Sequence, residues 1–155
     1  MDTVATFESV TNATTGLFGG RAEAHVEDRL SNMGIDLVAV AESHVLLFNR
    51  MRDYLHGEPL EEVWPDMVSF AESCELGQWM ANQGRLSFGH LPSFARLREA
   101  HIEFHQGAAS VLEKVRAGSW IAAEHMRKQE FSQSLRRVLI MVTELNEDIR
   151  NSSAS

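Results

Sequence analysis

The residues most able to carry chemistry are Cys74, the single cysteine of the chain, and three of its seven histidines, His44, His101 and His105. Each interrupts a regular series of apolar residues, so each is expected to point inward from a helix. His101 and His105 are four residues apart, which places two imidazoles on one helical face at a separation that suits a single metal ion. Imidazole nitrogen and thiolate sulfur are ligands that Zn²⁺ prefers, so these four residues predict a tetrahedral zinc site.

Each of these residues also has a simpler interpretation when it is taken alone. A single histidine on an apolar face usually hydrogen-bonds to a carbonyl group in the core, and a single buried cysteine usually acts as a small hydrophobic residue. The coincidence of all four favours a metal, because three buried imidazoles without a shared partner would leave several polar nitrogens unsatisfied, at about 1 to 3 kcal/mol each. A di-iron site is not indicated, since the apolar series lack the required Glu-x-x-His pairs.

The surroundings of the cysteine suit a metal ligand. Gly77 lies three residues after Cys74, so another backbone segment can approach the sulfur closely. Leu76 and Trp79 flank the same stretch, and we expect the indole ring to cover the site. The segment around Cys74 is therefore predicted to be tightly packed.

A catalytic zinc site is the alternative to a closed one. The segment His101-Ile-Glu-Phe-His105 resembles the metalloprotease motif His-Glu-x-x-His, but Glu103 follows the first histidine by two residues, so the carboxylate would face away from the metal. Four protein ligands also leave no coordination position for a reacting water molecule. We therefore predict that the protein is not an enzyme.

Four series of apolar residues, spaced at alternating steps of three and four, predict four helices that position these ligands. The expected ranges are about 30–57, 63–84, 91–118 and 120–150. Gly57 and Gly118 are expected to end the first and third helices, Pro65 to lie in the first turn of the second, and Ser119 to cap the fourth. Residues 85–90 are expected to form a loop.

Strand patterns are nearly absent, so the sequence predicts an all-α fold, an antiparallel four-helix bundle. At about 1.5 Å per residue the fourth helix would be ~45 Å long and the second ~30 Å, so the fourth extends beyond its neighbour. We therefore expect Leu145 and Ile149, near its end, to contact a second copy or a partner coiled coil. Residues 1–20 are expected to be a flexible or weakly helical lead-in, 21–150 the bundle, and 151–155 a frayed polar tail.

Composition excludes several classes of partner. The chain has 155 residues, 14 Lys and Arg against 22 Asp and Glu, and a formal charge of −8, which disfavours binding to nucleic acid. Its longest apolar runs fall far short of the roughly 20 residues that span a membrane, and no secretory signal is visible at the start. A single cysteine excludes an internal disulfide, and we expect a cytoplasmic protein with a reduced thiol.

The pattern His44-x-x-Leu47, Cys74-x-Leu76-Gly77-x-Trp79 and His101-x-x-x-His105 resembles the chemoreceptor zinc-binding domain, abbreviated CZB. The resemblance covers about residues 35–117 and includes three separated motif segments in the family's order. It implies that His44, Cys74, His101 and His105 are zinc ligands in a cytoplasmic, often dimeric, helical sensor. Members of this family are attached to chemoreceptors or diguanylate cyclases, and they report zinc availability or oxidation by hypochlorous acid through the cysteine.

This sequence contains neither a receptor signalling hairpin nor a cyclase domain, so we expect its output to reach another molecule in chemotaxis or cyclic-di-GMP signalling. A thiolate is both a metal ligand and a nucleophile, so Cys74 is the candidate redox switch: its oxidation to a sulfenic acid would release it from the metal. The alternative is a helical adaptor or dimerisation module, in which the zinc is purely structural and Cys74 is inert.

Overall fold

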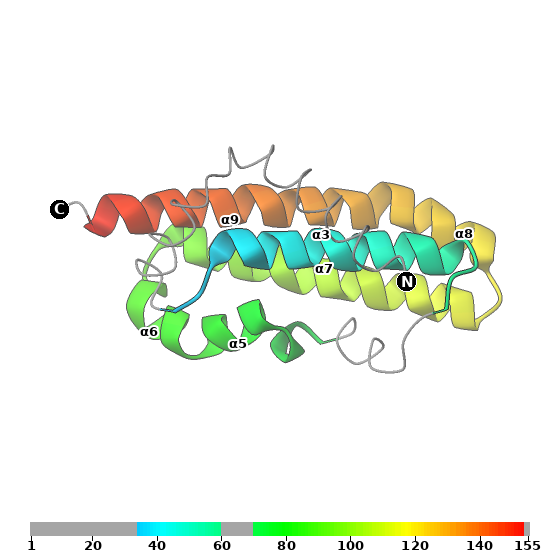
Figure 1. The fold of residues 1–155 in the computed structure, drawn as a ribbon, viewed down its shortest axis with the longest axis horizontal. Helices are drawn as coiled ribbons and strands as arrows, with labels where there is room; N and C mark the ends of the chain where they lie inside the picture. Colours follow the sequence, from blue (N-terminus) through cyan, green and yellow to red (C-terminus); the bar gives the residue numbers. More distant parts are fainter. Residues whose placement is uncertain (1–33, 60–69, 154–155) are drawn as a thin grey trace.

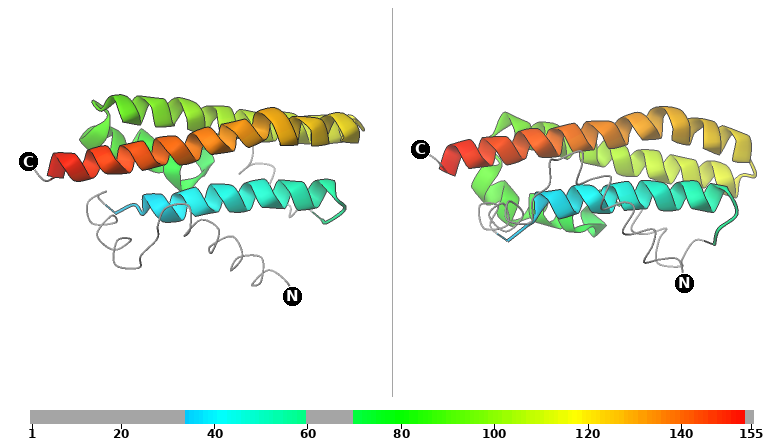
Figure 2. Two further views of the ribbon diagram at one scale, coloured as in Figure 1. Left: turned by 90° about the horizontal axis from the view of Figure 1, so that it is seen from above. Right: turned by 45° about the horizontal axis from the view of Figure 1, so that its top comes forward.

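Three long helical rods lie side by side and form the body of the molecule (Figures 1 and 2). The computed structural model describes residues 34–59 and 70–153, and every regular element in these ranges is a helix. The rods are α3 (Leu37–Leu55), α7 (Pro92–Arg116), and a continuous rod made of α8 (Trp120–Met126), the π-helical turn η2 (Arg127–Phe131) and α9 (Ser132–Ser153). The prediction of an all-α protein is confirmed over these residues.

The chain direction alternates from one segment to the next. Helices α3 and α7 run in the same direction, and the α8–α9 rod runs in the opposite one, packed against both of them (Figure 1). The described part of the segment between α3 and α7 contains three short elements, η1 (Ala71–Ser73), α5 (Glu75–Ala81) and α6 (Gln83–Phe88). Elements η1 and α5 pack against α7, and α6 packs against α5. The described residues therefore form three long rods and one interrupted segment.

Helix α3 begins at Leu37, later than the start at residue 30 that the apolar series predicts. Oδ1 of Asp36 accepts hydrogen bonds from the amides of Val38 and Ala39, both at 3.1 Å, which is the standard way to satisfy the first amides of a helix. Gly34 precedes this cap with a φ of 95°, a conformation that a helix excludes. The apolar spacing continues across this turn, so it could not locate the helix start.

Two glycines end the long rods as predicted. Gly57 has a φ of 108° and Gly118 a φ of 80°, the left-handed conformation that glycine adopts without strain. After α3 the amide of Glu58 donates to the carbonyl of Asp53 at 3.0 Å, and after α7 the amide of Ser119 donates to Lys114 at 2.8 Å. These are Schellman C-caps. Ser119 then occupies the N-cap of α8, although its side chain makes no capping hydrogen bond.

The second predicted helix, about 63–84, is wrong as a single element. Residues 60–69, including Pro65, lie outside the described residues, and the remainder is divided at two points of non-helical backbone. Cys74 is extended, with φ −93° and ψ 160°, and Asn82 has φ −120° and ψ −101°. The loop predicted over 85–90 is also wrong in its first part, because α6 continues to Phe88. Tertiary packing determines where the helix is interrupted, and the spacing of apolar residues contains no information about these positions.

The core is one continuous cluster that extends along the full length of the rods. Leu145 and Ile149 belong to this cluster and are both fully buried, so the prediction that they contact another molecule is wrong. The last turns of α9 extend past the start of α3 in Figures 1 and 2, and Leu145 and Ile149 nevertheless share one buried cluster with Leu37 of α3 and Leu97 of α7. Helix α9 continues to Ser153, three residues beyond the predicted helix end at residue 150. The predicted lead-in, residues 1–20, lies outside the described residues.

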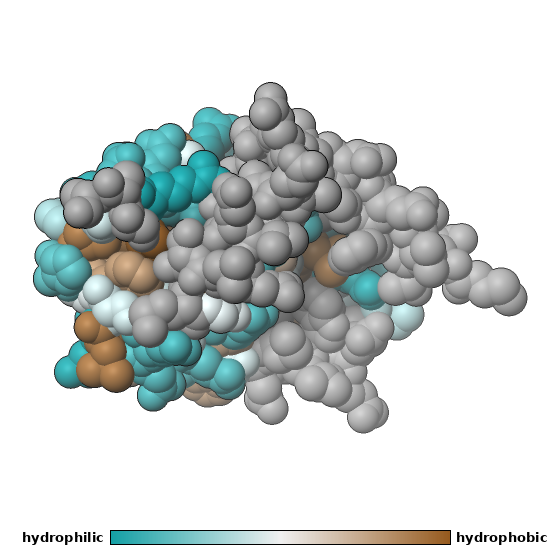
Figure 3. Space-filling model, turned by 60° about the vertical axis from the view of Figure 1, so that its left-hand side comes forward, coloured by the Kyte–Doolittle hydropathy of each residue, from teal (hydrophilic) through white to brown (hydrophobic). Residues whose placement is uncertain are grey.

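The described surface is mostly hydrophilic, with small separate apolar areas in the view of Figure 3. The large hydrophobic side chains that are exposed come from several different elements: Phe70, Leu86, Ile102, Trp120, Ile121 and Ile140. Scattered single residues of this kind are normal on a folded protein. No helix in residues 34–59 and 70–153 is long and apolar enough to span a membrane.

Replacing Leu145 by alanine is expected to destabilise the protein by about 2 to 5 kcal/mol, because it leaves a cavity in the core of a single chain. The free energy of unfolding, measured by urea denaturation, checks this value. The control is Ile140→Ala on the same helix, where the side chain is 49% exposed and the loss is expected to be small. A loss for Leu145→Ala that disappears on tenfold dilution would instead place this residue between two molecules.

Candidate metal centre

Four side chains from three separate parts of the chain converge at one point between the rods. His44 comes from α3, His101 and His105 come from successive turns of α7, and Cys74 is the N-cap residue of α5. One ligand atom from each residue lies within 4.8 Å of all the others. The structure thus brings together all four residues that the sequence predicts, although Cys74 precedes a helix rather than lying on its apolar face.

The distances between these atoms fit a small tetrahedral ion. Nε2 of His101 lies 3.0 Å from Sγ of Cys74 and 3.1 Å from Nε2 of His105, and Sγ lies 3.9 Å from Nε2 of His44. Ligand atoms around tetrahedral Zn²⁺ are about 3.3 to 3.6 Å apart, given Zn–N and Zn–S bonds of about 2.0 to 2.3 Å. Adjustments of roughly an ångström or less would bring all four atoms to one ion.

The ring of His44 is held by the helix that carries it. Its Nδ1 lies 2.8 Å from the carbonyl oxygen of Val40, one turn earlier in α3. A hydrogen bond from Nδ1–H to this carbonyl fixes the tautomer and leaves Nε2 with a free lone pair directed at the cluster. This carbonyl partner is typical of histidines that bind metals through the other nitrogen.

The sulfur of Cys74 is positioned by the short elements on either side of it. The amide of Gly77 donates to Sγ at 3.5 Å, so the sulfur caps the first turn of α5. A Cβ atom on Gly77 would lie 1.9 Å from the carbonyl oxygen of Ala71, so only glycine permits η1 and α5 to pack this closely. The predicted close backbone approach at Gly77 is therefore confirmed, and it places the sulfur against the imidazoles.

Burial determines the charge of the ligand set. Desolvation lowers the pKa of His44 to about 4, opposed in part by the hydrogen bond to Val40, and it lowers the pKa of His101 to about 2. Both imidazoles are therefore neutral at physiological pH, which is the form that binds a metal. Burial raises the pKa of the Cys74 thiol, although the amides of Gly77 and Leu76 oppose the shift. Without a metal the site thus holds neutral imidazoles at His44 and His101 and a protonated thiol.

Phe104 packs against the cluster, in the role that the sequence predicts for Trp79. The Phe104 ring lies edge-to-face against His44 and His105, with ring centroids 5.3 and 5.4 Å apart. It also stacks on Phe131 of η2 at 4.9 Å. Trp79 packs instead on Phe88 and Phe94, toward α6 and the start of α7. The sequence could have indicated this role, because Phe104 lies between His101 and His105 on the same apolar face of one predicted helix.

The remaining candidates for chemistry lie away from the cluster. Glu103, the residue considered as a catalytic base, is exposed and forms an ion pair with Arg137 of α9. His56 lies 3.4 Å from a carboxylate oxygen of Glu124, and His125 is exposed on α8. No other group of three or more potential metal ligands occurs in the part of the chain that the structure describes.

The comparisons with known proteins support this geometry. No significant match to this chain was found among curated proteins or among solved structures. A family model, described as the chemoreceptor zinc-binding domain, matches residues 44–112, a range that begins at the first of the four residues and includes the other three. This is a zinc-binding, regulatory family rather than a family of enzymes. Residues 44–112 of this chain are therefore a member of the chemoreceptor zinc-binding domain family.

Proposed function

We propose that His44, Cys74, His101 and His105 bind one Zn²⁺ ion and that the domain, residues 21–150, is a sensor whose state depends on this ion. The observation that carries the proposal is the convergence of four buried or half-buried ligand atoms within 4.8 Å. Zinc supplies a charge that holds the thiolate and four bonds that join three segments of the chain. In structural peptide sites, zinc binding contributes about 10 to 16 kcal/mol at neutral pH, more than the whole stability of a typical domain.

The unequal attachment of the ligands suggests how the state of the site reaches the fold. The three histidines lie on α3 and α7, two long rods whose apolar faces are buried along their length. Cys74 lies between a three-residue helix and a seven-residue helix, elements too short to be stable without tertiary contacts. Loss of the sulfur ligand therefore frees the short segment first, while the rods keep their packing in the core.

Oxidation is one chemical event that removes this ligand. A thiolate attacks the oxygen of hypochlorous acid; a sulfur–oxygen bond forms, the oxygen–chlorine bond breaks, and the products are a sulfenic acid and chloride. The sulfur supplies both electrons, and the sulfenic acid is a much weaker ligand than the thiolate. Cys74 is half-buried, whereas the three histidines are each at most 3% exposed, and this partial exposure permits attack by a small oxidant. Cys74 is thus the proposed redox switch.

The setting of this sensor is also part of the proposal. We infer a cytoplasmic location, because a reduced thiol is needed for metal binding. We infer that the zinc-loaded domain is an antiparallel four-helix bundle, in which residues 71–88 belong to the second rod. It passes its state to a chemoreceptor, another chemotaxis protein or a diguanylate cyclase, and it has no catalytic activity of its own. A homodimer stays a prediction.

The alternative function is a helical adaptor whose zinc is only structural. The observation that favours it is the extent of burial, because a centre covered by Phe104 and placed within the main core resembles a permanent structural element. In that case Cys74 would stay bound to the metal at every oxidant concentration that leaves the rest of the protein intact. The two functions therefore differ in one measurable property, the release of zinc by a mild oxidant.

Metal analysis of the full chain, purified without added zinc, is expected to find close to one zinc ion per chain. His44→Ala and His101→Ala should each weaken zinc binding by more than about 100-fold, because each removes one of four bonds. Competition with a chromogenic chelator measures this affinity. The matched control, His125→Ala, is expected to bind zinc as the unchanged protein does, since His125 is exposed on α8. Equal zinc affinity for all three variants would exclude the site.

Zinc binding at pH 7.5 is expected to release about one proton, which comes from Cys74. His44 and His101 are already neutral, because their folded-state pKa values are about 4 and 2, whereas the raised pKa of Cys74 keeps its thiol protonated. Apparent zinc affinity should therefore rise about tenfold per pH unit above pH 7 and level off only above the raised pKa of Cys74. Calorimetry in buffers of different ionisation enthalpy counts the protons, and release of two or more would contradict this assignment.

Stoichiometric hypochlorous acid is expected to release zinc from the unchanged protein and to loosen the segment 71–81. The chelator signal measures the release, and amide hydrogen exchange measures the loosening. Cys74→Asp serves as the control, because a carboxylate is a zinc ligand that this oxidant does not modify. This variant should keep its zinc under the same treatment. Zinc release only at doses that oxidise methionines throughout the protein would favour the structural adaptor.

A further inference from the structure

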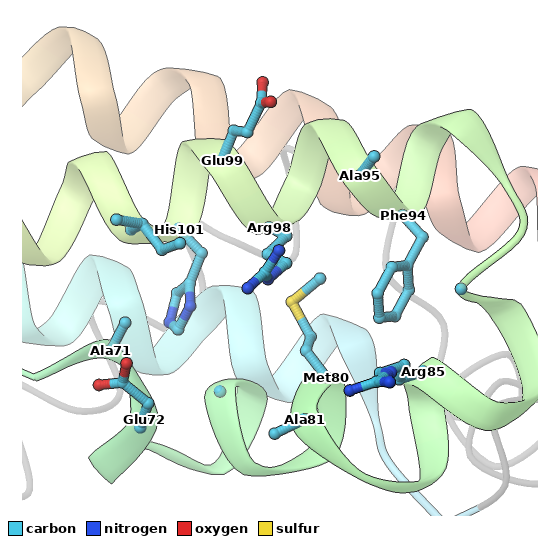
Figure 4. Close-up of a pocket in the computed structure, with 13 residues that line it drawn as sticks. Ala71, Glu72, Met80, Ala81, Arg85, Phe94, Ala95, Arg98, Glu99 and His101 are labelled. Atoms are coloured by element: carbon cyan, nitrogen blue, oxygen red, sulfur yellow. The ribbon is translucent and has the colours of Figure 1, made fainter.

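A cavity of about 460 Å³ lies beside the metal centre, between α7 on one side and η1, α5 and α6 on the other (Figure 4). Its inner end is formed by His101, one of the four proposed zinc ligands. Its volume lies within the range of small-molecule sites, about 300 to 1,000 Å³. His44, Cys74 and His105 do not line this cavity, so zinc binding itself makes no use of most of it.

The lining of the cavity combines apolar side chains with two cations. Met80 of α5 and Phe94 of α7 supply a buried apolar surface, and both are at least 95% buried. Arg98 extends from α7, and Arg85 extends from α6 on the opposite side, so that Met80 and Phe94 lie between them in Figure 4. A ligand that fills this space would thus meet an apolar wall and a guanidinium group from each side.

The charges of the two arginines are not neutralised within the described residues. Neither guanidinium has a hydrogen-bond or ion-pair partner there, whereas Arg96, Arg127 and Arg137 each pair with a glutamate. Two carboxylates also line the cavity, but Figure 4 shows Glu99 directed away from it on the far side of α7. Glu72 lies at the other end, beside Ala71. The part of the cavity around Met80 and Phe94 is therefore cationic.

We propose that this cavity binds a small organic anion, a carboxylate on an apolar body, held by Arg85 and Arg98 and packed on Met80 and Phe94. Guanidinium groups bind carboxylates through two parallel hydrogen bonds, which a single point charge cannot provide. The apolar body replaces water against Met80 and Phe94. The domain thus has an anion site next to its metal centre.

The anion site is coupled to the metal centre, and this part of the inference rests on the proposed function. A zinc ion with one thiolate and three neutral imidazoles carries a net charge of +1, whereas the metal-free cluster is neutral. His101 is both one of the four proposed ligands and a lining residue of the cavity, so this charge would lie next to the cavity. Zinc therefore strengthens binding of the anion, and by thermodynamic reciprocity the anion strengthens binding of zinc by the same factor.

The test uses benzoate, benzamide and benzamidinium, three probes of the same shape with charges of −1, 0 and +1. Each is titrated into the zinc-loaded full chain, and binding is followed by calorimetry or by NMR shifts of α7 residues. Benzoate is expected to bind in the millimolar range and at least tenfold more tightly than the other two probes. Equal or tighter binding of benzamidinium would overturn the proposal, because the acidic side chains would then determine the charge preference.

The double variant Arg85→Gln, Arg98→Gln is expected to weaken benzoate binding at least tenfold while it keeps one zinc ion per chain. Its matched control is Arg116→Gln, which removes an exposed arginine from the far end of the same helix and should leave benzoate binding unchanged. Benzoate affinity that does not respond to the double variant would overturn the site.

A final comparison separates the anion site from the metal centre. Benzoate is titrated into the zinc-loaded chain and the zinc-free chain, with zinc content measured on the same samples. Several-fold weaker binding without zinc supports the coupling, and equal binding overturns it while the anion site stands. A chain that binds no zinc but still binds benzoate through Arg85 and Arg98 would refute the metal centre alone. A zinc-loaded chain that binds no benzoate would refute the anion site alone.

Discussion

Burial of three imidazoles and a thiol among hydrocarbon side chains is the constraint on which the rest of this structure depends. His44, His101 and His105 are each at most 3% exposed, and burial disfavours the charged forms of His44 and His101. Neutral imidazoles still present polar nitrogens, and the Nε2 atoms of this cluster lie within hydrogen-bonding distance of one another or of the sulfur. A shared ion would bind the same atoms at one point and join the three segments that carry them.

The surroundings of the cluster show how its state can be transmitted. Phe104 contacts two of the imidazoles on one side and stacks on Phe131 on the other. Phe131 belongs to the π-helical turn η2, where the rod α8–α9 departs from regular α-helix, and Phe48 of α3 contacts the same ring at 5.1 Å. Irregular turns of this kind are common at functional sites in helices. All three rods therefore meet in one aromatic group beside the metal centre.

Among residues 34–59 and 70–153, the short segment that carries Cys74 is the part least supported by its own secondary structure. Gly77 allows η1 to pack against α5, and Gly84 allows the Trp79 ring to lie against α6, since a Cβ there would be 2.6 Å from ring atoms. These close contacts hold the segment where helical hydrogen bonding alone would not. The same segment forms one wall of the cavity that contains Arg85 and Arg98. Movement of Cys74 would therefore alter the cavity as well as the metal centre.

Much of this arrangement follows from local sequence. The helical class, the glycine caps at Gly57 and Gly118 and the four candidate ligands were all predicted, because each depends on residue type and spacing over a few positions. The spacing of His101 and His105 fixes their common face on α7 regardless of what packs against it. That the four ligands meet can also be expected without knowledge of the tertiary fold. Each interrupts an apolar series and so faces inward, and the inward-facing residues of one small domain share one core.

Tertiary packing decided the remaining features. It divided the second predicted helix at Cys74 and Asn82, and it buried Leu145 and Ile149 in the same core cluster as Leu37 and Leu97. It also packed Phe104, rather than Trp79, against the metal centre, and it placed Arg85 opposite Arg98. Periodicity specifies which face of a helix is apolar, but not where backbone breaks improve packing or which distant residue covers that face. Those outcomes depend on contacts between segments far apart in the sequence. The energies of such contacts cannot be inferred from a local sequence pattern.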